Sequence, residues 1–355
     1  MTINDKKKLT NKVQTVLGLI NKEDMGITLC HEHCLFDLTC IFNKPGKGDR
    51  KKFAYQDEKL SIKNVGYLRY HVLDNIDNLV SMDEDLAIEE LLYFKYYGGK
   101  TIIDVTPIGM ERDPIALKKI SLATGLNIVM GSGYYVEDSL DKEKIDNMTE
   151  NDIAQEIVDE IFNGVEDTEI CPGIIGEIGC SYPLTDREKK ILQGAGIAQK
   201  ETGAPLTVHP GRFEEAPFGI IKILKEVGAD LTHTSICHID RTVFEPKNRY
   251  KLCDFGVFLQ YDEWGTEGYY PVPPIDILND TQRISEIKDL VKHGYQNQIL
   301  IAHDICYKCR YRVYGGHGYN HILTNAIPEM KKRELRDDVI QDLIINNPKN
   351  FFVFR

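Results

Sequence analysis

Short, mostly apolar runs alternate with longer amphipathic segments along most of this chain. The apolar runs span about five to eight residues, are rich in Ile, Val and Leu, and are bounded by Gly, Pro or polar residues. Runs of this length and composition predict β-strands that are buried on both faces. We expect strands at residues 26–33, 101–106, 126–131, 173–178, 205–209, 232–238, 257–261 and 298–304.

The segments between these runs carry helix start and stop signals. Several end directly before a glycine, as at Gly125, Gly203 and Gly228, which is typical of a helix that closes in a left-handed conformation. We expect helices at residues 83–97, 113–124, 149–162, 185–202, 216–227, 246–255, 281–293 and 333–345, and a short final helix that opens at Asn347-Pro348.

The alternation of strand and helix predicts the fold class. Eight buried strands that are each followed by a helix favour a closed (β/α)8 barrel, with an open doubly wound sheet as the alternative. The run at 13–20 predicts a short N-terminal β extension, separated from 26–33 by a turn at 21–24. Residues 43–52, rich in Gly, Lys and Pro, predict an exposed loop, and 66–79 are ambiguous. We expect one α/β domain over residues 1–355, because no linker interrupts the alternation.

Composition narrows the function classes. The formal net charge is -12, which argues against a protein that binds nucleic acid or an anionic membrane by charge alone. No run of 18 apolar residues predicts a membrane span, and the polar, Lys-rich start does not resemble a secretory signal. The nine cysteines are an odd number and mostly stand singly in apolar stretches. We therefore expect reduced thiols and a cytosolic protein.

Polar residues of metal-ligand type fall at the ends of the predicted strands. In a barrel the carboxyl ends of the strands form the active-site face, so side chains placed there can meet. His31 and His33 are two positions apart, which puts them on the same side of a strand. The complete set at the strand ends is His31, His33, Glu177, His209, His238 and Asp304.

Each of these residues also has a structural interpretation. The histidines could be hydrogen-bonded residues of the barrel rim, and Glu177 could pair with a lysine or arginine. Together, however, six ligands are too many for one tetrahedral ion and suit two metals that share a carboxylate. Mixed histidine and carboxylate ligation suits Zn, Mn, Co or Fe. Two metals that activate a water between them predict hydrolysis, with Asp304 also placed to accept a proton.

Several segments resemble the phosphotriesterase family of the amidohydrolase superfamily. They are Thr28-Leu-Cys-His-Glu-His33, Gly173-Ile-Ile-Gly-Glu-Ile-Gly-Cys180, Val208-His-Pro-Gly-Arg212, Ala302-His-Asp304 and Tyr314-Gly-Gly-His-Gly-Tyr-Asn-His-Ile-Leu-Thr-Asn325. The resemblance covers nearly the whole chain and implies a (β/α)8 barrel with two divalent metal ions, for which zinc is expected. It also implies that His31, His33 and Asp304 hold the more buried ion, and that His209 and His238 hold the more exposed one.

Glu177 stands where phosphotriesterases proper carry a carboxylated lysine as the bridge. This departure disfavours organophosphate hydrolysis and favours a branch of the family that is implied to hydrolyse N-acetyltaurine to taurine and acetate, with some reach to N-acetyl amino acids. Two alternatives stay open: a lactonase or esterase that uses the same two-metal site, and a non-catalytic protein that keeps its metals and binds a ligand.

The implied substrate is a small molecule with an anionic tail, which needs a cation at the mouth of the barrel. Arg212, Arg241 and Arg310 follow three of the predicted strands, and a guanidinium group suits a sulfonate or carboxylate. Each could equally be a surface arginine. The expected partners exclude nucleic acid and membranes, and a homodimer is one expectation for the assembly.

Overall fold

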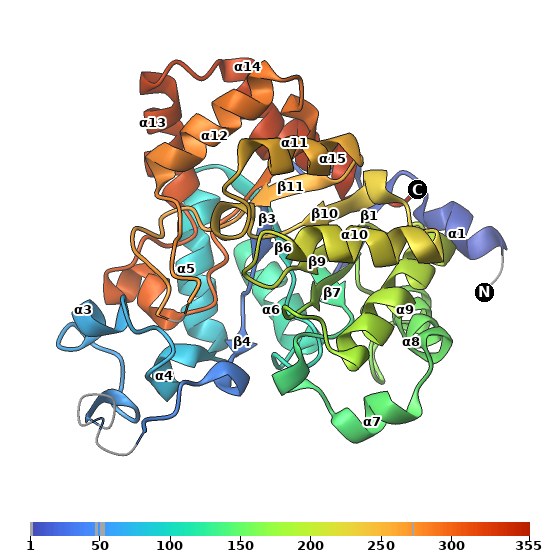
Figure 1. Ribbon diagram of the computed structural model, residues 1–355, viewed down its shortest axis with the longest axis horizontal. Coiled ribbons are helices and arrows are strands. Elements are labelled where there is room, and N and C mark those ends of the chain that lie inside the picture. The colour runs from blue at the N-terminus through green and yellow to red at the C-terminus, as the bar shows by residue number, and fades with distance from the viewer. Residues whose placement is uncertain (1–2, 47–48, 50–53, 272) are drawn as a thin grey trace.

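The computed structural model describes residues 3–46, 49, 54–271 and 273–355. Its centre is a sheet of eight parallel strands in the order β12-β11-β10-β9-β8-β7-β6-β3, which curves into a nearly closed barrel (Figure 1). The predicted barrel is confirmed and the open-sheet alternative is wrong. The strands are β3 (Ile27–Glu32), β6 (Gly99–Asp104), β7 (Asn127–Ser132), β8 (Ile174–Gly179), β9 (Leu206–His209), β10 (Thr234–Ile236), β11 (Phe258–Tyr261) and β12 (Ile299–Ile301).

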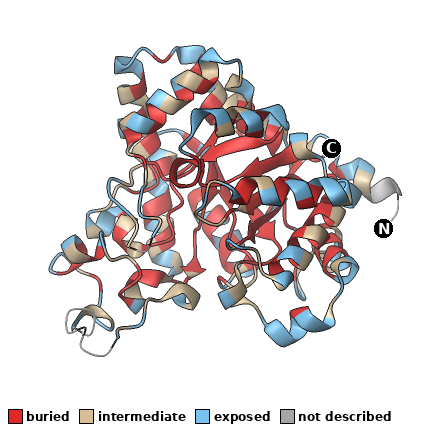
Figure 2. Ribbon diagram, in the orientation of Figure 1, coloured by how far each residue is buried: buried red, intermediate tan, exposed pale blue. Residues whose placement is uncertain are grey.

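Helices surround this barrel, and their outward faces are exposed whereas the strands are buried (Figure 2). They begin and end where the sequence signals predict. For example, the Asp113 side chain caps the backbone N–H of Ala116, Pro114 occupies the first turn, and Gly125 ends the helix in the left-handed conformation. The outer helices are α5 (Glu84–Tyr96), α6 (Pro114–Thr124), α8 (Glu150–Asn163), α9 (Asp186–Thr202), α10 (Ala216–Val227), α11 (Pro246–Asp254) and α12 (Asp280–Lys292).

The N-terminal extension is a hairpin rather than one extended segment. β1 (Lys12–Thr15) pairs antiparallel with β2 (Gly18–Asn21), because Gly18 takes a positive φ and lets the chain reverse. The short helix α1 (Ile3–Leu9) precedes it and was not predicted. Val13 packs with Phe351 and Phe352 from the chain's end in a cluster that fills the amino end of the barrel.

The described part of residues 36–81 covers the opposite end, and it includes the residues 66–79 that the sequence left ambiguous. It contains β4 (Phe36–Asp37), α3 (Val65–Leu68), α4 (Ile76–Leu79) and β5 (Val80–Ser81). Its apolar side chains pack against Tyr135, Cys306 and Tyr307, which belong to loops that follow barrel strands. The predicted loop at 43–52 begins in this segment, but residues 47, 48 and 50–52 lie outside the described residues.

The C-terminal helices depart from the prediction. α13 (Ile327–Lys332) ends before Arg333, and Glu334 takes a positive φ in the turn that follows. The next helix therefore begins at Asp337, not at Arg333. Helical structure then continues through α14 (Asp337–Gln341), a π-helical stretch (Asp342–Asn346) and α15 (Asn347–Phe351). The wider π turn accommodates Pro348, which has no N–H to donate. α7 (Lys142–Asn147) was not predicted either.

The barrel closes between β3 and β12 through polar contacts. The Asp304 backbone N–H donates to the His31 carbonyl at 3.2 Å. The buried Glu32 carboxylate accepts hydrogen bonds from the backbone N–H groups of His303 (2.9 Å) and Ile305 (3.1 Å) and contacts the His303 ring nitrogen Nδ1 at 2.8 Å. The Glu32 side chain thus links the end of β3 to the segment after β12.

Candidate metal centre and substrate cavity

The structure brings the six residues of ligand type together at the carboxyl end of the barrel. They come from β3, β8, β9 and the residues that follow β3, β10 and β12. Five of them are buried, and the side chain of His209 is 16% exposed, so the group is open to the cavity on one side. The members are His31, His33, Glu177, His209, His238 and Asp304.

Irregular backbone turns several of these side chains inward. Cys30 packs in the cluster inside the barrel, so strict alternation would aim His31 at the helices. The β3–β6 pairing shifts register between Leu29 and Glu32, which places His31 inside as well. The β8–β9 pairing shifts between Ile175 and Ile178 and does the same for Glu177.

A left-handed backbone conformation, rather than a shift of strand register, turns His238 toward the site. His238 follows β10, where Ile236 packs toward the helices, and takes a left-handed conformation with φ of 55°. Asp304, after β12, has φ of 51°. Both positions were predicted as strand ends, but the strands stop at Ile236 and Ile301. Strained residues at such points are typical of functional sites.

Glu177 lies between the histidines with its two oxygens facing different neighbours. Oε1 is 3.5 Å from His33 Nε2. Oε2 is 3.0 Å from His209 Nδ1, 3.4 Å from His238 Nε2 and 3.4 Å from His31 Nε2. Burial alone would raise the pKa of Glu177, but the nearby histidines outweigh it and lower that pKa well below its ordinary value. The carboxylate is therefore ionised and would suit a cation held among these histidines.

Asp304 faces the first pair of histidines. Its Oδ1 is 3.2 Å from His33 Nε2 and 3.6 Å from His31 Nε2. Burial opposes charge on His33, yet its contact with Asp304 raises the pKa of His33 to about 9. A positive charge is thus favoured between these groups, and a metal ion would supply it.

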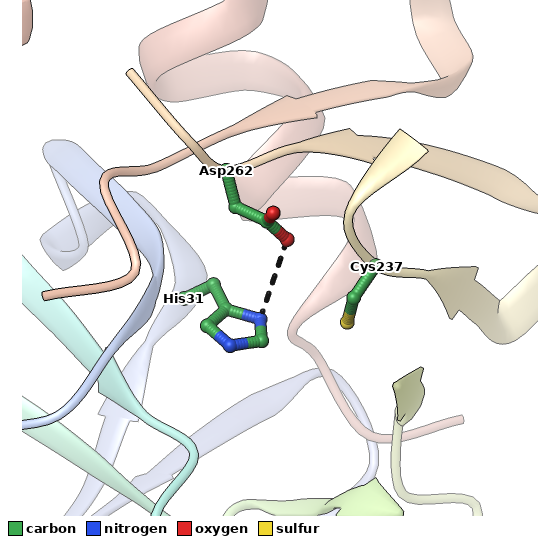
Figure 3. A group of neighbouring side chains, drawn as sticks. All are labelled: His31, Cys237 and Asp262. Atoms are coloured by element: carbon green, nitrogen blue, oxygen red, sulfur yellow. Dashed lines mark ion pairs between the residues drawn. The ribbon is translucent and has the colours of Figure 1, made fainter. Parts of the chain in front are cut away.

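Asp262 supports histidines on both sides of the group. Its Oδ1 is 2.6 Å from His238 Nδ1, and its Oδ2 is 3.5 Å from His31 Nδ1 (Figure 3). Cys237 lies in the same neighbourhood (Figure 3), but burial raises the pKa of its thiol well above the ordinary value, and a protonated thiol is a poor ligand. A carboxylate behind a histidine fixes which ring nitrogen faces a metal.

The chemistry of this group fits divalent cations. Both ring nitrogens of His31 are buried and have no hydrogen-bond partner among the described residues. Leaving them unpaired is costly, and a cation bound to the lone pair of one nitrogen would reduce that cost. The ligand atoms of His31, His33 and Asp304 lie within 4.8 Å of one another, and so do those of His31, Glu177 and His238. An ion about 2.0–2.2 Å from each nitrogen and oxygen could sit within such spacings.

A cavity of about 240 Å³ opens beside this group. Four of the ligand-type residues, His33, Glu177, His209 and Asp304, line this cavity. All three arginines named from the sequence, Arg212, Arg241 and Arg310, line it as well. Its size suits a small substrate. Three aromatic side chains also line the cavity: Tyr135, Tyr270 and Tyr307.

Sequence reasoning missed two carboxylates, Asp262 and Glu263. Asp262 contacts two histidines of the centre, and Glu263 lies between arginines in the cavity wall. Both directly follow β11 (Phe258–Tyr261), so the rule that found the other residues, polar side chains at strand ends, applies to them too.

Comparisons with known proteins agree with the fold and identify the family. The model of the phosphotriesterase family matches residues 11–352. The chain is 40% identical to human N-acetyltaurine hydrolase over 350 residues, which cover 98% of this chain and 99% of that protein. It is 41% identical to N-acetyltaurine hydrolase of Dictyostelium discoideum, over 95% of this chain and 96% of that protein. A resiniferatoxin-binding protein from Rhodobacter sphaeroides has a similar structure, with a TM-score of 0.93, 35% identity and coverage of 97% and 95%.

Among the described residues, no helix is both long and apolar enough to span a lipid bilayer.

Proposed function

The chain belongs to the phosphotriesterase family, and from that premise we propose that it hydrolyses N-acetyltaurine to taurine and acetate with two divalent metal ions. One observation carries the proposal: four of the six ligand-type side chains and all three arginines line the same small cavity. A hydrolytic centre and a site for an anion therefore share one space. The names of relatives about 40% identical over nearly the whole chain support the same reaction.

The assignment of residues to the two ions follows the family resemblance. On that basis His31, His33 and Asp304 would hold one ion, His209 and His238 the other, and Glu177 both. Divalent cations held by these residues would lower the pKa of a bound water and polarise the carbonyl of the amide. Asp304 then accepts a proton from the attacking water and delivers it to the nitrogen that leaves as the amine of taurine.

The arginines supply the charge that an anionic tail requires. Arg241 and Arg310 are buried or nearly so, and Arg212 stacks on the Tyr270 ring at 4.0 Å. Guanidinium groups that are largely buried bind a sulfonate or carboxylate more strongly than surface groups do. N-Acetyl amino acids carry a carboxylate at the corresponding end, which makes them secondary substrates in this proposal.

An assay of the purified protein tests this function. We expect acetate and taurine from N-acetyltaurine, loss of activity after chelation, and recovery when Zn²⁺ is added back. Lactones and aryl esters, assayed in parallel, cover the alternative of a lactonase or esterase. Faster turnover of a lactone than of N-acetyltaurine would overturn the proposal. Metal-bound protein with no turnover of any of these would favour a ligand-binding role, in line with the name of the Rhodobacter protein.

The variant Asp304→Asn examines the proton transfer directly. An amide can still contact a metal through its oxygen, but it cannot accept and return a proton. We expect metal content to fall only in part and kcat to fall about 100-fold or more, which is the usual contribution of such a group. Metal analysis and initial rates measure the two effects separately. Unchanged kcat at equal metal content would exclude the proposed role of Asp304.

Three further features belong to this proposal. We expect zinc, because histidine and carboxylate ligands suit it, and elemental analysis of the purified protein would identify the metal.

A cytosolic location is supported by nine cysteines of which none forms a disulfide among the described residues, and fractionation tests it. A homodimer is supported by exposed apolar residues on α5 and α6, among them Tyr96 and Leu122, and light scattering tests it.

A further inference from the structure

Glu263 occupies the wall of the substrate cavity between two of the three arginines. It lies just after β11 and is 4% exposed. Its Oε2 is 2.9 Å from Arg310 Nη2, and its Oε1 is 3.4 Å from Arg241 Nε. The backbone N–H of Glu263 donates to Asp240 Oδ2 at 3.0 Å, which fixes its position. Both carboxylate oxygens therefore face guanidinium groups, as the oxygens of a bound substrate anion would.

The third arginine has different neighbours. Arg212 donates to the carbonyl oxygens of Pro274 (3.1 Å) and Asp276 (3.4 Å) and stacks on Tyr270, and no ion pair joins it to a carboxylate within the part of the chain that the structure describes. Burial, followed by repulsion from Arg241, lowers the pKa of Arg212 to about 10, so it stays charged at neutral pH. Of the three arginines, it is therefore the one that has no carboxylate within ion-pair distance among the described residues.

We propose that Glu263 determines substrate specificity by taking the place of a second anion between Arg241 and Arg310. The cavity then accepts a substrate with one anionic group, paired with Arg212, and rejects one with two. A second anion would meet the Glu263 carboxylate in a buried cavity, where repulsion between like charges is weakly screened. This inference rests on the proposed function, since it concerns the anionic tail of that substrate.

The variant Glu263→Gln keeps the shape of the side chain and removes its charge. We expect the ratio of kcat/KM for N-acetylaspartate, which has two carboxylates, to that for N-acetyltaurine to rise about tenfold, which corresponds to about 1.4 kcal/mol. Glu267→Gln is the matched control, because Glu267 is an exposed carboxylate on the same loop and contacts none of the three arginines. It should leave the ratio unchanged.

Measuring the metal content of the variant distinguishes a role of Glu263 in substrate specificity from a role as a metal ligand. The Glu263 carboxylate lies within 4.8 Å of ligand atoms of His238 and Asp304, so it could in principle hold an ion. We expect Glu263→Gln to retain the metal content of the parent protein. Loss of metal, or an equal loss of activity toward both substrates, would overturn the proposal, because either result assigns Glu263 a structural or ligand role.

Binding of two inert anions tests the inference independently of turnover. Calorimetry on the metal-loaded protein would compare ethanesulfonate, with one charge, and ethane-1,2-disulfonate, with two. We expect Glu263→Gln to raise the affinity for the disulfonate relative to the monosulfonate, again about tenfold. An unchanged ratio, or no binding of either anion to any of the proteins, would refute the role of Glu263. Absence of N-acetyltaurine hydrolysis with a shifted binding ratio would instead reject only the proposed reaction.

Discussion

A single carboxylate, Asp262, contacts a histidine from each of the two proposed ligand sets. It accepts the His238 backbone N–H at 3.0 Å, lies 2.6 Å from the His238 ring and 3.5 Å from the His31 ring, and is fully buried. Its role is to hold both rings with Nε2 turned toward Glu177. At the scale of single residues, the centre therefore depends on a side chain outside the proposed set of six ligands.

The variant Asp262→Asn should weaken metal binding without disturbing the fold. An amide accepts a hydrogen bond less strongly than a carboxylate, so the His238 ring is held less firmly. We expect metal affinity to fall about 10- to 100-fold, as is usual when such a partner of a ligand is changed. Competition with a chelator of known affinity measures it. Asp159→Asn, on the exposed face of α8, is the control, and equal affinities in both variants would contradict this role.

His233 gives the protein an acid-sensitive stability. Burial, with help from Arg355, lowers its pKa from 6.5 to about 4, and it lies 2.8 Å from the Phe351 carbonyl. Above pH 6.5 this group is neutral whether the chain is folded or unfolded. Between pH 6.5 and about 4 only the unfolded chain takes up the proton, so stability falls as pH falls, by at most about 3 kcal/mol.

We expect His233→Gln to flatten this part of the pH profile of stability. Glutamine can donate to the Phe351 carbonyl but does not titrate, so the difference in melting temperature between pH 7 and pH 4.5 should shrink relative to the parent protein. Thermal unfolding at a series of pH values measures it. The same slope in both proteins would show that other groups cause the acid sensitivity.

At the scale of elements, helices α6 and α9 end in the same way but face different surroundings. Gly125 and Gly203 both take a left-handed conformation, with φ of 65° and 73°. A Cβ atom on Gly125 would have only Lys95 Nζ nearby, at 3.7 Å. On Gly203 it would lie 2.0 Å from the carbonyl oxygen of Arg355, whose N–H donates to Gly203. A side chain at Gly125 would therefore strain only the backbone, whereas a side chain at Gly203 would also clash with Arg355.

Alanine substitutions at the two glycines should therefore lower the free energy of unfolding by different amounts. Gly125→Ala should cost about 1 kcal/mol, which is the strain of a left-handed residue with a side chain. Gly203→Ala should cost clearly more, because it also displaces the C-terminal residue. Denaturant unfolding of the two variants gives the comparison. Equal losses would mean that the chain's end shifts at no cost.

At the scale of the whole molecule, Glu32 joins the two edges of the barrel. Its carboxylate faces two backbone N–H groups and the His303 ring after β12, and the same two segments carry His31, His33 and Asp304. Closure of the barrel and the geometry of the centre thus depend on the same two segments. A change that weakens the closure should also weaken the centre.

Glu32→Ala should destabilise the protein and weaken its metal binding together. Three buried donors lose their acceptor, and each unpaired group costs about 1–3 kcal/mol, so we expect a loss of about 3 kcal/mol or more. Glu32→Gln keeps one acceptor oxygen and should lose less. Unfolding curves and metal analysis test both variants. A stable Glu32→Ala protein with full metal content would show that the barrel closes without this side chain.

The sequence by itself determined the order of elements and where the chemistry lies along the chain. Apolar runs and glycine stops are local, because a buried strand needs apolar side chains and a helix end needs a left-handed residue. The six ligand-type residues stood out for the same reason: a polar group at the end of an apolar strand must have a partner.

Only the tertiary structure decided which way those side chains point and what they meet. Alternation from Cys30 would have turned His31 away, and the register shift that corrects it depends on pairing with β6. Asp262 and Glu263 gain their roles from β3, β10 and the loop after β12, which are distant in sequence. Local patterns encode the need for burial or a partner, whereas the identity of the partner depends on strand register and barrel closure, which the whole chain sets together.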